Sequence, residues 1–125
     1  MYRIRKQFTF SASHHLYNLP PDHPCSRIHG HNYTIELVLA SPSLNMKGFV
    51  RDYRELDEFK NYVADKLDHR DLNEVFEGMQ TSAENLARKL FTWCYERWPI
   101  IETVRVSETS KTWAEYTEEE HALDT

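Results

Sequence analysis

Two stretches in the first third of the chain alternate apolar and polar side chains, and they constrain the fold more than any other feature. The first runs from Tyr2 to Phe10 and the second from Tyr33 to Leu39. Side chains of a strand point alternately to opposite faces, so the pattern predicts two strands with one buried face each. The stretch 18–24 between them contains three prolines and predicts a loop.

Two helices are expected in the middle of the chain. Asp52 with Glu55, and Thr81 with Glu84, have the spacing of capping boxes at helix starts, and Pro99 ends the second helix. Apolar residues follow each start at helical spacing. They are Leu56, Phe59, Val63 and Leu67 in the first helix, and Ala83, Leu86, Ala87, Leu90 and Cys94 in the second.

Alternation returns near the end of the chain. Val104 and Val106 predict a third strand that reaches Glu108, and 113–116 predicts a short fourth, while Phe49-Val50 could briefly resume pairing. The order β-β-α-α-β-β favours an α+β fold, with an antiparallel sheet and both helices on one face. Such a sheet has two exposed edges, which oligomers often cover.

Length and charge limit the classes of function. A chain of 125 residues predicts a single domain, 1–125, and its net charge of −5 without a basic cluster gives no reason to expect nucleic acid binding. The sequence shows neither a signal peptide nor a membrane-spanning run, so we expect a cytoplasmic protein with free thiols. The acidic residues 118–120 with Asp124 read as a solvated tail.

The richest chemistry surrounds the start of the second strand. His29 and His31 flank Gly30, so their imidazoles point to the same face of an extended chain. The pair His14-His15, at the end of the first strand, would supply a third imidazole if the two strands pair antiparallel, although surface or core histidines are the plainer reading. Three imidazoles hold zinc and leave one position open, as in catalytic sites.

The two cysteines have different surroundings. Cys94 falls among apolar helix residues and predicts a small core side chain, whereas Cys25 lies in a polar, histidine-rich loop and is the candidate for reactivity. Cys25 could be a fourth ligand of a structural metal. Structural sites usually pair thiolates at short spacing, so we place Cys25 beside the metal and not on it.

Other polar residues allow two readings each. Asp68 could orient His69 for acid–base work, with Asp71 as an alternative partner, or His69 could simply end a helix. Glu108 could be exposed, or it could accept two parallel N–H bonds from a guanidine-like heterocycle edge. The pair Thr81-Ser82 is first of all a helix cap.

With these residues the chain resembles the 6-pyruvoyl-tetrahydropterin synthase family, and within it the bacterial 6-carboxy-tetrahydropterin synthase branch. Five segments match the family in its order along nearly the whole chain. They are Phe10-Ser11-Ala12-Ser13-His14, Cys25-x-x-x-His29-Gly30-His31-Asn32-Tyr33, Leu67-Asp68-His69-Arg70-Asp71-Leu72-Asn73, Thr81-Ser82-Ala83-Glu84-Asn85, and Ser107-Glu108-Thr109 leading into Trp113-Ala114-Glu115-Tyr116.

The resemblance implies the tunnelling fold (T-fold), in which the sheets of several subunits close a barrel, as a homo-hexamer built from two trimers. It implies zinc on His14, His29 and His31, Cys25 as the base, and Asp68 with His69 as its acid–base partners. It also implies a pterin anchored by Glu108, with Thr81 and Ser82 near the pterin edge. Because relatives build their sites at subunit contacts, His69 or Glu108 could face the zinc of a neighbouring chain.

The expected reaction converts 7,8-dihydroneopterin triphosphate to 6-carboxy-5,6,7,8-tetrahydropterin, acetaldehyde and triphosphate, towards queuosine and other 7-deazaguanines. The three residues between Cys25 and His29 favour this branch over the pyruvoyl-forming enzymes, which resemble a longer insertion. A pyruvoyl-forming synthase, a non-catalytic pterin-binding module and a structural zinc protein remain the alternatives. His15 departs from the family, because relatives often carry arginine there, and Arg27 or Lys111 could compensate in holding phosphate.

Overall fold

The two alternating stretches form one long antiparallel pair. In the computed structural model, which describes residues 1–118, β1 (Tyr2–His14) pairs with β2 (His29–Ser41) along its whole length, with Tyr2 opposite Ser41 and His14 opposite His29. Both strands run beyond the predicted limits, because main-chain pairing continues through small polar residues that break the apolar alternation. The expected loop between them contains one short helical turn, η1 (Pro24–Ser26).

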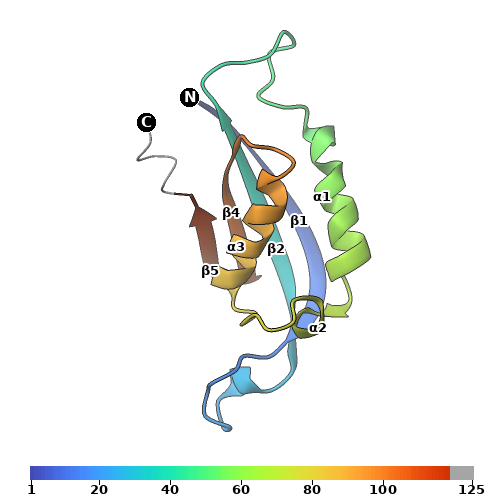
Figure 1. Cartoon of the computed structure of the whole chain (residues 1–125), viewed down its shortest axis with the longest axis vertical. Helices are drawn as coiled ribbons and strands as arrows, with labels where there is room; N and C mark the ends of the chain where they lie inside the picture. The colour runs from blue at the N-terminus through green and yellow to red at the C-terminus, as the bar shows by residue number, and fades with distance from the viewer. Residues whose placement is uncertain (119–125) are drawn as a thin grey trace.

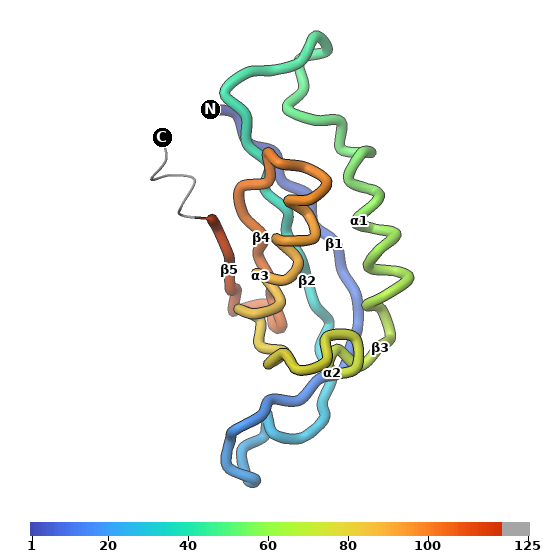
Figure 2. The backbone as a smooth tube through the Cα atoms, viewed as in Figure 1, coloured from blue at the N-terminus to red at the C-terminus, as the bar shows by residue number. Residues whose placement is uncertain are grey.

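Five strands make up the sheet, in the order β3-β1-β2-β4-β5. Figure 1 shows β1, β2, β4 and β5 side by side. The two predicted C-terminal strands are β4 (Ile101–Thr109) and β5 (Thr112–Thr117), and both join the sheet antiparallel. The fifth strand, β3 (Arg70–Asp71), runs parallel to the end of β1 (Figure 2). We did not predict it, because two polar residues carry no alternating pattern.

The first predicted helix is a continuous helical stretch. It consists of a 3-10 turn, η2 (Tyr53–Leu56), an α-helix, α1 (Asp57–Tyr62), and a π-helical turn, η3 (Val63–Leu67). The Asp52 side chain caps it by accepting a hydrogen bond from the Arg54 backbone N–H, as expected. Glu55 does not complete the capping box as predicted; its carboxylate lies 3.8 Å from the guanidinium of Arg51. A short helix that the sequence did not predict, α2 (Leu72–Val75), follows β3.

The second predicted helix is α3 (Ala83–Tyr95). Its N-cap is Ser82, whose hydroxyl accepts a hydrogen bond from the Asn85 N–H, so the prediction of Thr81 as the cap was wrong by one residue. The Thr81 side chain is instead fully buried in a polar network, described below. The predicted apolar positions Leu86, Ala87, Leu90 and Cys94 are buried.

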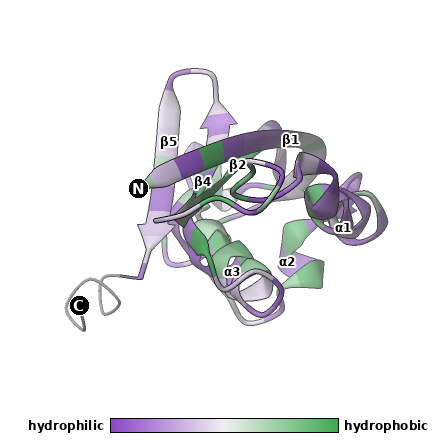
Figure 3. Ribbon diagram, turned by 90° about the horizontal axis from the view of Figure 1, so that it is seen from above, coloured by the Kyte–Doolittle hydropathy of each residue, from purple (hydrophilic) through white to green (hydrophobic). Residues whose placement is uncertain are grey.

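The two predicted helices lie on the same side of the sheet, as expected, and α2 lies on that side too (Figure 3). Apolar side chains of the helices and of the sheet form the core between them. Even-numbered residues of β1, odd-numbered residues of β2, and Ile101, Val104 and Val106 of β4 supply the sheet's contribution. Cys94 is fully buried and free, and burial raises the pKa of its thiol.

Three further sequence predictions concern the loop before η2, the acidic tail and membrane crossing. Phe49 and Val50 do not resume strand pairing; they lie in the loop before η2, where Phe49 is exposed. The acidic tail lies outside the described residues except for Glu118. Within residues 1–118, none of the helices combines the length and the apolar character that crossing a membrane requires.

Candidate metal centre

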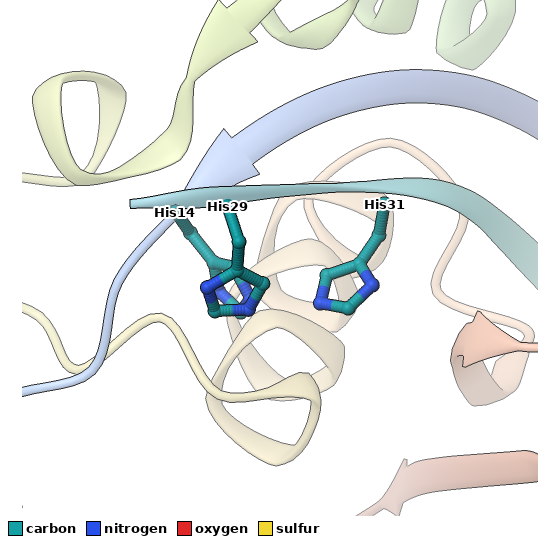
Figure 4. A group of neighbouring side chains, drawn as sticks. All are labelled: His14, His29 and His31. Carbon is teal, nitrogen blue, oxygen red and sulfur yellow. The ribbon is translucent and has the colours of Figure 1, made fainter. Parts of the chain in front are cut away.

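Three histidines meet where β1 ends and β2 begins. The pairing register sets His14 directly opposite His29 and Ala12 opposite His31. His14, His29 and His31 therefore share the helix-covered face, and their imidazoles project to the same side of the strand pair (Figure 4). One ring nitrogen from each lies within 4.8 Å of the others, so small imidazole rotations would let one ion contact all three.

Backbone carbonyls orient two of these rings. His14 Nδ1 lies 2.8 Å from the Thr81 carbonyl oxygen, and His29 Nδ1 lies 2.7 Å from that of Arg27. A carbonyl only accepts hydrogen bonds, so each Nδ1 carries a proton, and in a neutral ring this leaves the lone pair on Nε2. This second contact on the imidazole is the arrangement found around metal-bound histidines.

Two buried ring nitrogens of the same histidine group lack hydrogen-bond partners in the part of the chain that the structure describes. His14 Nε2 and His31 Nε2 are buried and have no hydrogen-bond partner among the described residues. A buried polar atom without a hydrogen bond costs free energy of folding, and a bound cation would remove this cost. Burial is the main cause that lowers the pKa of both His14 and His31, while the nearby Glu108 carboxylate opposes it. Neutral imidazoles are the form that binds a metal, so the donor set fits a divalent ion.

Cys25 is not part of this group. Among the histidine, cysteine and acidic side chains of residues 1–118, those brought together at metal-binding distance are the three histidines. Cys25 is half-buried in η1, where its N–H donates to His23 Nδ1 and its carbonyl oxygen accepts from the Leu16 N–H. These bonds fasten the thiol's loop to the chain just beyond β1.

Glu108 connects the histidines to an open groove. Its carboxylate lies 3.7 Å from His31 Nε2, because Glu108 shares the helix-covered face of β4 with Val104 and Val106. The groove, of about 470 Å³, runs between the start of α3 and strands β4 and β5. Its lining residues are Leu16, Ser82, Ala83, Glu84, Val106, Glu108, Thr112, Trp113, Ala114 and Glu115.

Asp68 and His69 lie elsewhere, on the outer edge of β1. The Asp68 carboxylate accepts hydrogen bonds from the Ser11 N–H at 3.0 Å and from His69 Nδ1 at 3.0 Å, and these bonds lower its pKa. His69 has a positive φ of 59°, and its side chain is 81% exposed. The structure therefore pairs the two residues but does not bring them to the histidines of the same chain.

Asp71, the alternative carboxylate partner of His69, forms a hydrogen bond elsewhere. Asp71 caps α2 by accepting a hydrogen bond from the Asn73 N–H at 3.0 Å. The contact at His69 Nδ1 comes from Asp68. Of the two orienting carboxylates that the sequence left open, the structure thus favours Asp68.

Two polar residues beside the histidines were missed by the sequence reasoning. Asn73 is buried and bridges the chain after His14 to the loop before α3. Tyr33 is fully buried, its ring contacts those of His14 and His31, and its hydroxyl has no hydrogen-bond partner among the described residues. Both belong to matched motifs, but a single sequence does not show that their side chains face the site.

Known proteins resemble this chain over almost all of its length. The family model described as 6-pyruvoyl tetrahydropterin synthase matches residues 3–119. The 6-carboxy-5,6,7,8-tetrahydropterin synthase of Synechocystis is 32% identical over 124 residues, which cover 93% of each chain. The 6-pyruvoyl tetrahydrobiopterin synthase of Drosophila melanogaster is 32% identical over 104 residues, 72% of this chain but only 61% of the fly protein.

The fold has a close structural counterpart. The structure of Caenorhabditis elegans 6-pyruvoyl tetrahydropterin synthase superposes with a TM-score of 0.83 at 25% identity, covering 94% of this chain and 95% of the worm chain. The layered sheet and helices described above are therefore those of its T-fold relatives.

Proposed function

The chain belongs to the 6-pyruvoyl tetrahydropterin synthase family, and within that family we propose that it is a zinc-dependent lyase acting on 7,8-dihydroneopterin triphosphate. One water molecule would be consumed, and the products would be 6-carboxy-5,6,7,8-tetrahydropterin, acetaldehyde and triphosphate. One observation carries the proposal: three imidazoles converge beside a carboxylate that lines a groove.

His14, His29 and His31 would hold the zinc ion. A bound zinc ion supplies Lewis acidity, which polarises substrate oxygens and acidifies neighbouring C–H and O–H groups. Three protein ligands leave room for the substrate, as catalytic zinc sites require. The position of Cys25 outside the ligand group supports this reading over a structural site.

Glu108 would anchor the pterin. An ionised carboxylate accepts two parallel N–H bonds from the amino-pyrimidine edge of a pterin, and such charge-assisted pairs are strong and directional. Ser82 lines the same groove, so its hydroxyl would border the ring. Thr81 is fully buried behind the groove, and its part would be to support the site. Fixing the ring positions the substrate's side chain beside the histidines.

Cys25 would remove a proton from that side chain, and His69, oriented by Asp68, would return protons during triphosphate loss and carbon–carbon cleavage. The exposure of His69 and its place on the outer edge of β1 support a role in the site of a neighbouring subunit. We therefore propose a homo-oligomer, a hexamer of two trimers, in which each site combines residues of more than one chain.

Two related activities compete. A pyruvoyl-forming synthase would use the same residues without carbon–carbon cleavage, and a pterin-binding module would need Glu108 but neither Cys25 nor His69. The short spacing from Cys25 to His29 and the near-complete overlap with the Synechocystis carboxy-forming enzyme support the carboxy product. The presence of all three acid–base candidates supports catalysis.

Product analysis tests the proposal. Zinc-loaded protein is incubated with dihydroneopterin triphosphate, and the products are identified by mass spectrometry, with Cys25→Ala as the matched inactive control. We expect the carboxy product and acetaldehyde in equal amounts. A pyruvoyl product without acetaldehyde would establish the competing synthase, and unchanged substrate with stoichiometric binding would establish the binding module.

A further inference from the structure

Successive residues of the segment after η3 form hydrogen bonds or strand pairs with the end of β1. His69 N–H donates to the Ser11 carbonyl at 2.6 Å, and Arg70 and Asp71 then pair with Ala12 and Ser13 as β3. The next contact on this strip is made by a side chain, because Asn73 lies in α2 and faces the backbone of His15.

Asn73 uses its amide on both sides. Its Oδ1 accepts from the His15 N–H at 2.9 Å, and its Nδ2 donates to the His15 carbonyl at 3.0 Å, which repeats the two bonds of a strand partner. Nδ2 also lies 3.2 Å from the Tyr17 hydroxyl. Asn73 is buried, so these bonds are shielded from water and hold the residue after His14 in place.

The same amide reaches the loop that orients His14. The Thr81 hydroxyl donates to Asn73 Oδ1 at 3.1 Å and also lies 3.3 Å from the His15 carbonyl oxygen. The carbonyl of Thr81 is the group that accepts from His14 Nδ1. Asn73 thus contacts both the strand that carries His14 and the residue that orients its ring.

We propose that Asn73 is a positioning residue of the metal centre: by clamping His15 to Thr81, it keeps the Thr81 carbonyl on His14 Nδ1 and leaves His14 Nε2 directed at the ion. The inference rests on the metal site of the proposed function, but not on its substrate or product. Partners of this kind around metal-bound histidines are worth about 10- to 100-fold in metal affinity. Asn73 has no role in the acid–base chemistry proposed above.

Metal affinity is therefore the direct test. Zinc dissociation constants are measured by competition with a chromogenic chelator for the wild type and for Asn73→Ala, and the ligand field is followed in the cobalt-substituted proteins. We expect the Asn73→Ala variant to bind zinc at least about 10-fold more weakly, with an altered cobalt spectrum. The tautomer of His14, read from its ring ¹⁵N shifts in the metal-free protein, should lose its strict Nδ1–H form.

Gln80→Ala is the matched control. The Gln80 amide also clamps the two segments, accepting from the Tyr17 N–H at 2.7 Å and donating to the Tyr17 carbonyl at 3.0 Å, but it forms no side-chain bond to His15 or Thr81. We expect near wild-type zinc affinity in this variant. An equal loss of zinc affinity in both variants would mean that Asn73 only stabilises the loop, and it would overturn the proposal.

Thr81→Val keeps the test decisive if Asn73→Ala does not fold. It removes the hydroxyl that bonds Asn73 and that also lies 3.3 Å from His14 Nδ1, but it keeps the carbonyl that bonds His14. It should therefore weaken zinc binding in the same direction. The double variant should be no weaker than the worse single one, because both changes cut one linkage. Wild-type affinity and spectrum in both single variants would refute the role of Asn73. If the wild type itself binds no metal, the metal site falls, and this inference falls with it.

Discussion

The metal centre and the Asp68–His69 pair lie on opposite sides of the same strand, β1, and they differ in almost every physical respect. The histidines sit on the helix-covered face, with His14 only 1% exposed and held by a hydrogen bond to a backbone carbonyl. His69 lies at the sheet edge with an 81% exposed side chain and a backbone in the left-handed region.

This difference shows which part of the site a single chain can build. Strand register brings the three histidines of one chain together, so the candidate metal site is formed within the chain. Asp68 and His69 contact each other at the sheet edge and are not part of the histidine group. The folded chain therefore preorganises the candidate metal site, and under the proposed function assembly would complete the acid–base site.

Removing a metal ligand should give the largest effect. We expect His29→Ala to lose more than about 100-fold in zinc affinity and all turnover, since ligands matter more than their supporting contacts. His15→Ala is the matched control, because His15 adjoins His14 but is not in the ligand group. Metal content after dialysis distinguishes the two variants, and equal zinc loss in both would break the assignment of the centre.

Removing the thiol should separate chemistry from metal binding. Cys25→Ala should keep stoichiometric zinc and lose about 10²- to 10⁴-fold in kcat, the range of a general base. Steady-state kinetics and metal analysis of the same preparation give both values. Zinc released by this variant would instead make Cys25 a ligand and the site a structural one.

Mixing inactive variants should test whether the two regions serve different chains. Cys25→Ala and His69→Ala are co-expressed with different tags, and mixed oligomers are purified. If each site draws these residues from two chains, random 1:1 mixing restores about a quarter of the sites. Activity that stays at the level of the separate variants would place both residues in one chain and contradict the shared site.

The smallest effect is expected on stability at His69. A left-handed backbone costs about 1 kcal/mol or more at a residue other than glycine, while glycine adds about 0.5–1 kcal/mol of chain entropy to the unfolded state. His69→Gly should therefore change the free energy of unfolding by less than about 1 kcal/mol while it abolishes turnover. Denaturant unfolding measures the change, and a loss of several kcal/mol would mean that His69 holds the fold.

Sequence reasoning brought histidines of the first two strands together because alternation predicts the strands and their faces, while the choice of His14 over His15 came from the family resemblance. His14, His29 and His31 fall on one face once β1 and β2 pair antiparallel, and the structure has this pairing. It missed β3 and Asn73, because their contacts depend on how the segment after η3 packs against β1. It also placed the capping box at Thr81, one residue before the cap Ser82, since either hydroxyl of the pair fits a helix start and only packing buries one of them.

Extended X-ray absorption fine structure of the zinc-reconstituted protein is the sharpest test of zinc binding by the three histidines. We predict about one zinc per chain, with three imidazole nitrogens at about 2.0–2.1 Å and a remaining light-atom ligand. Sulfur in the first shell, or fewer than three imidazoles, would contradict it.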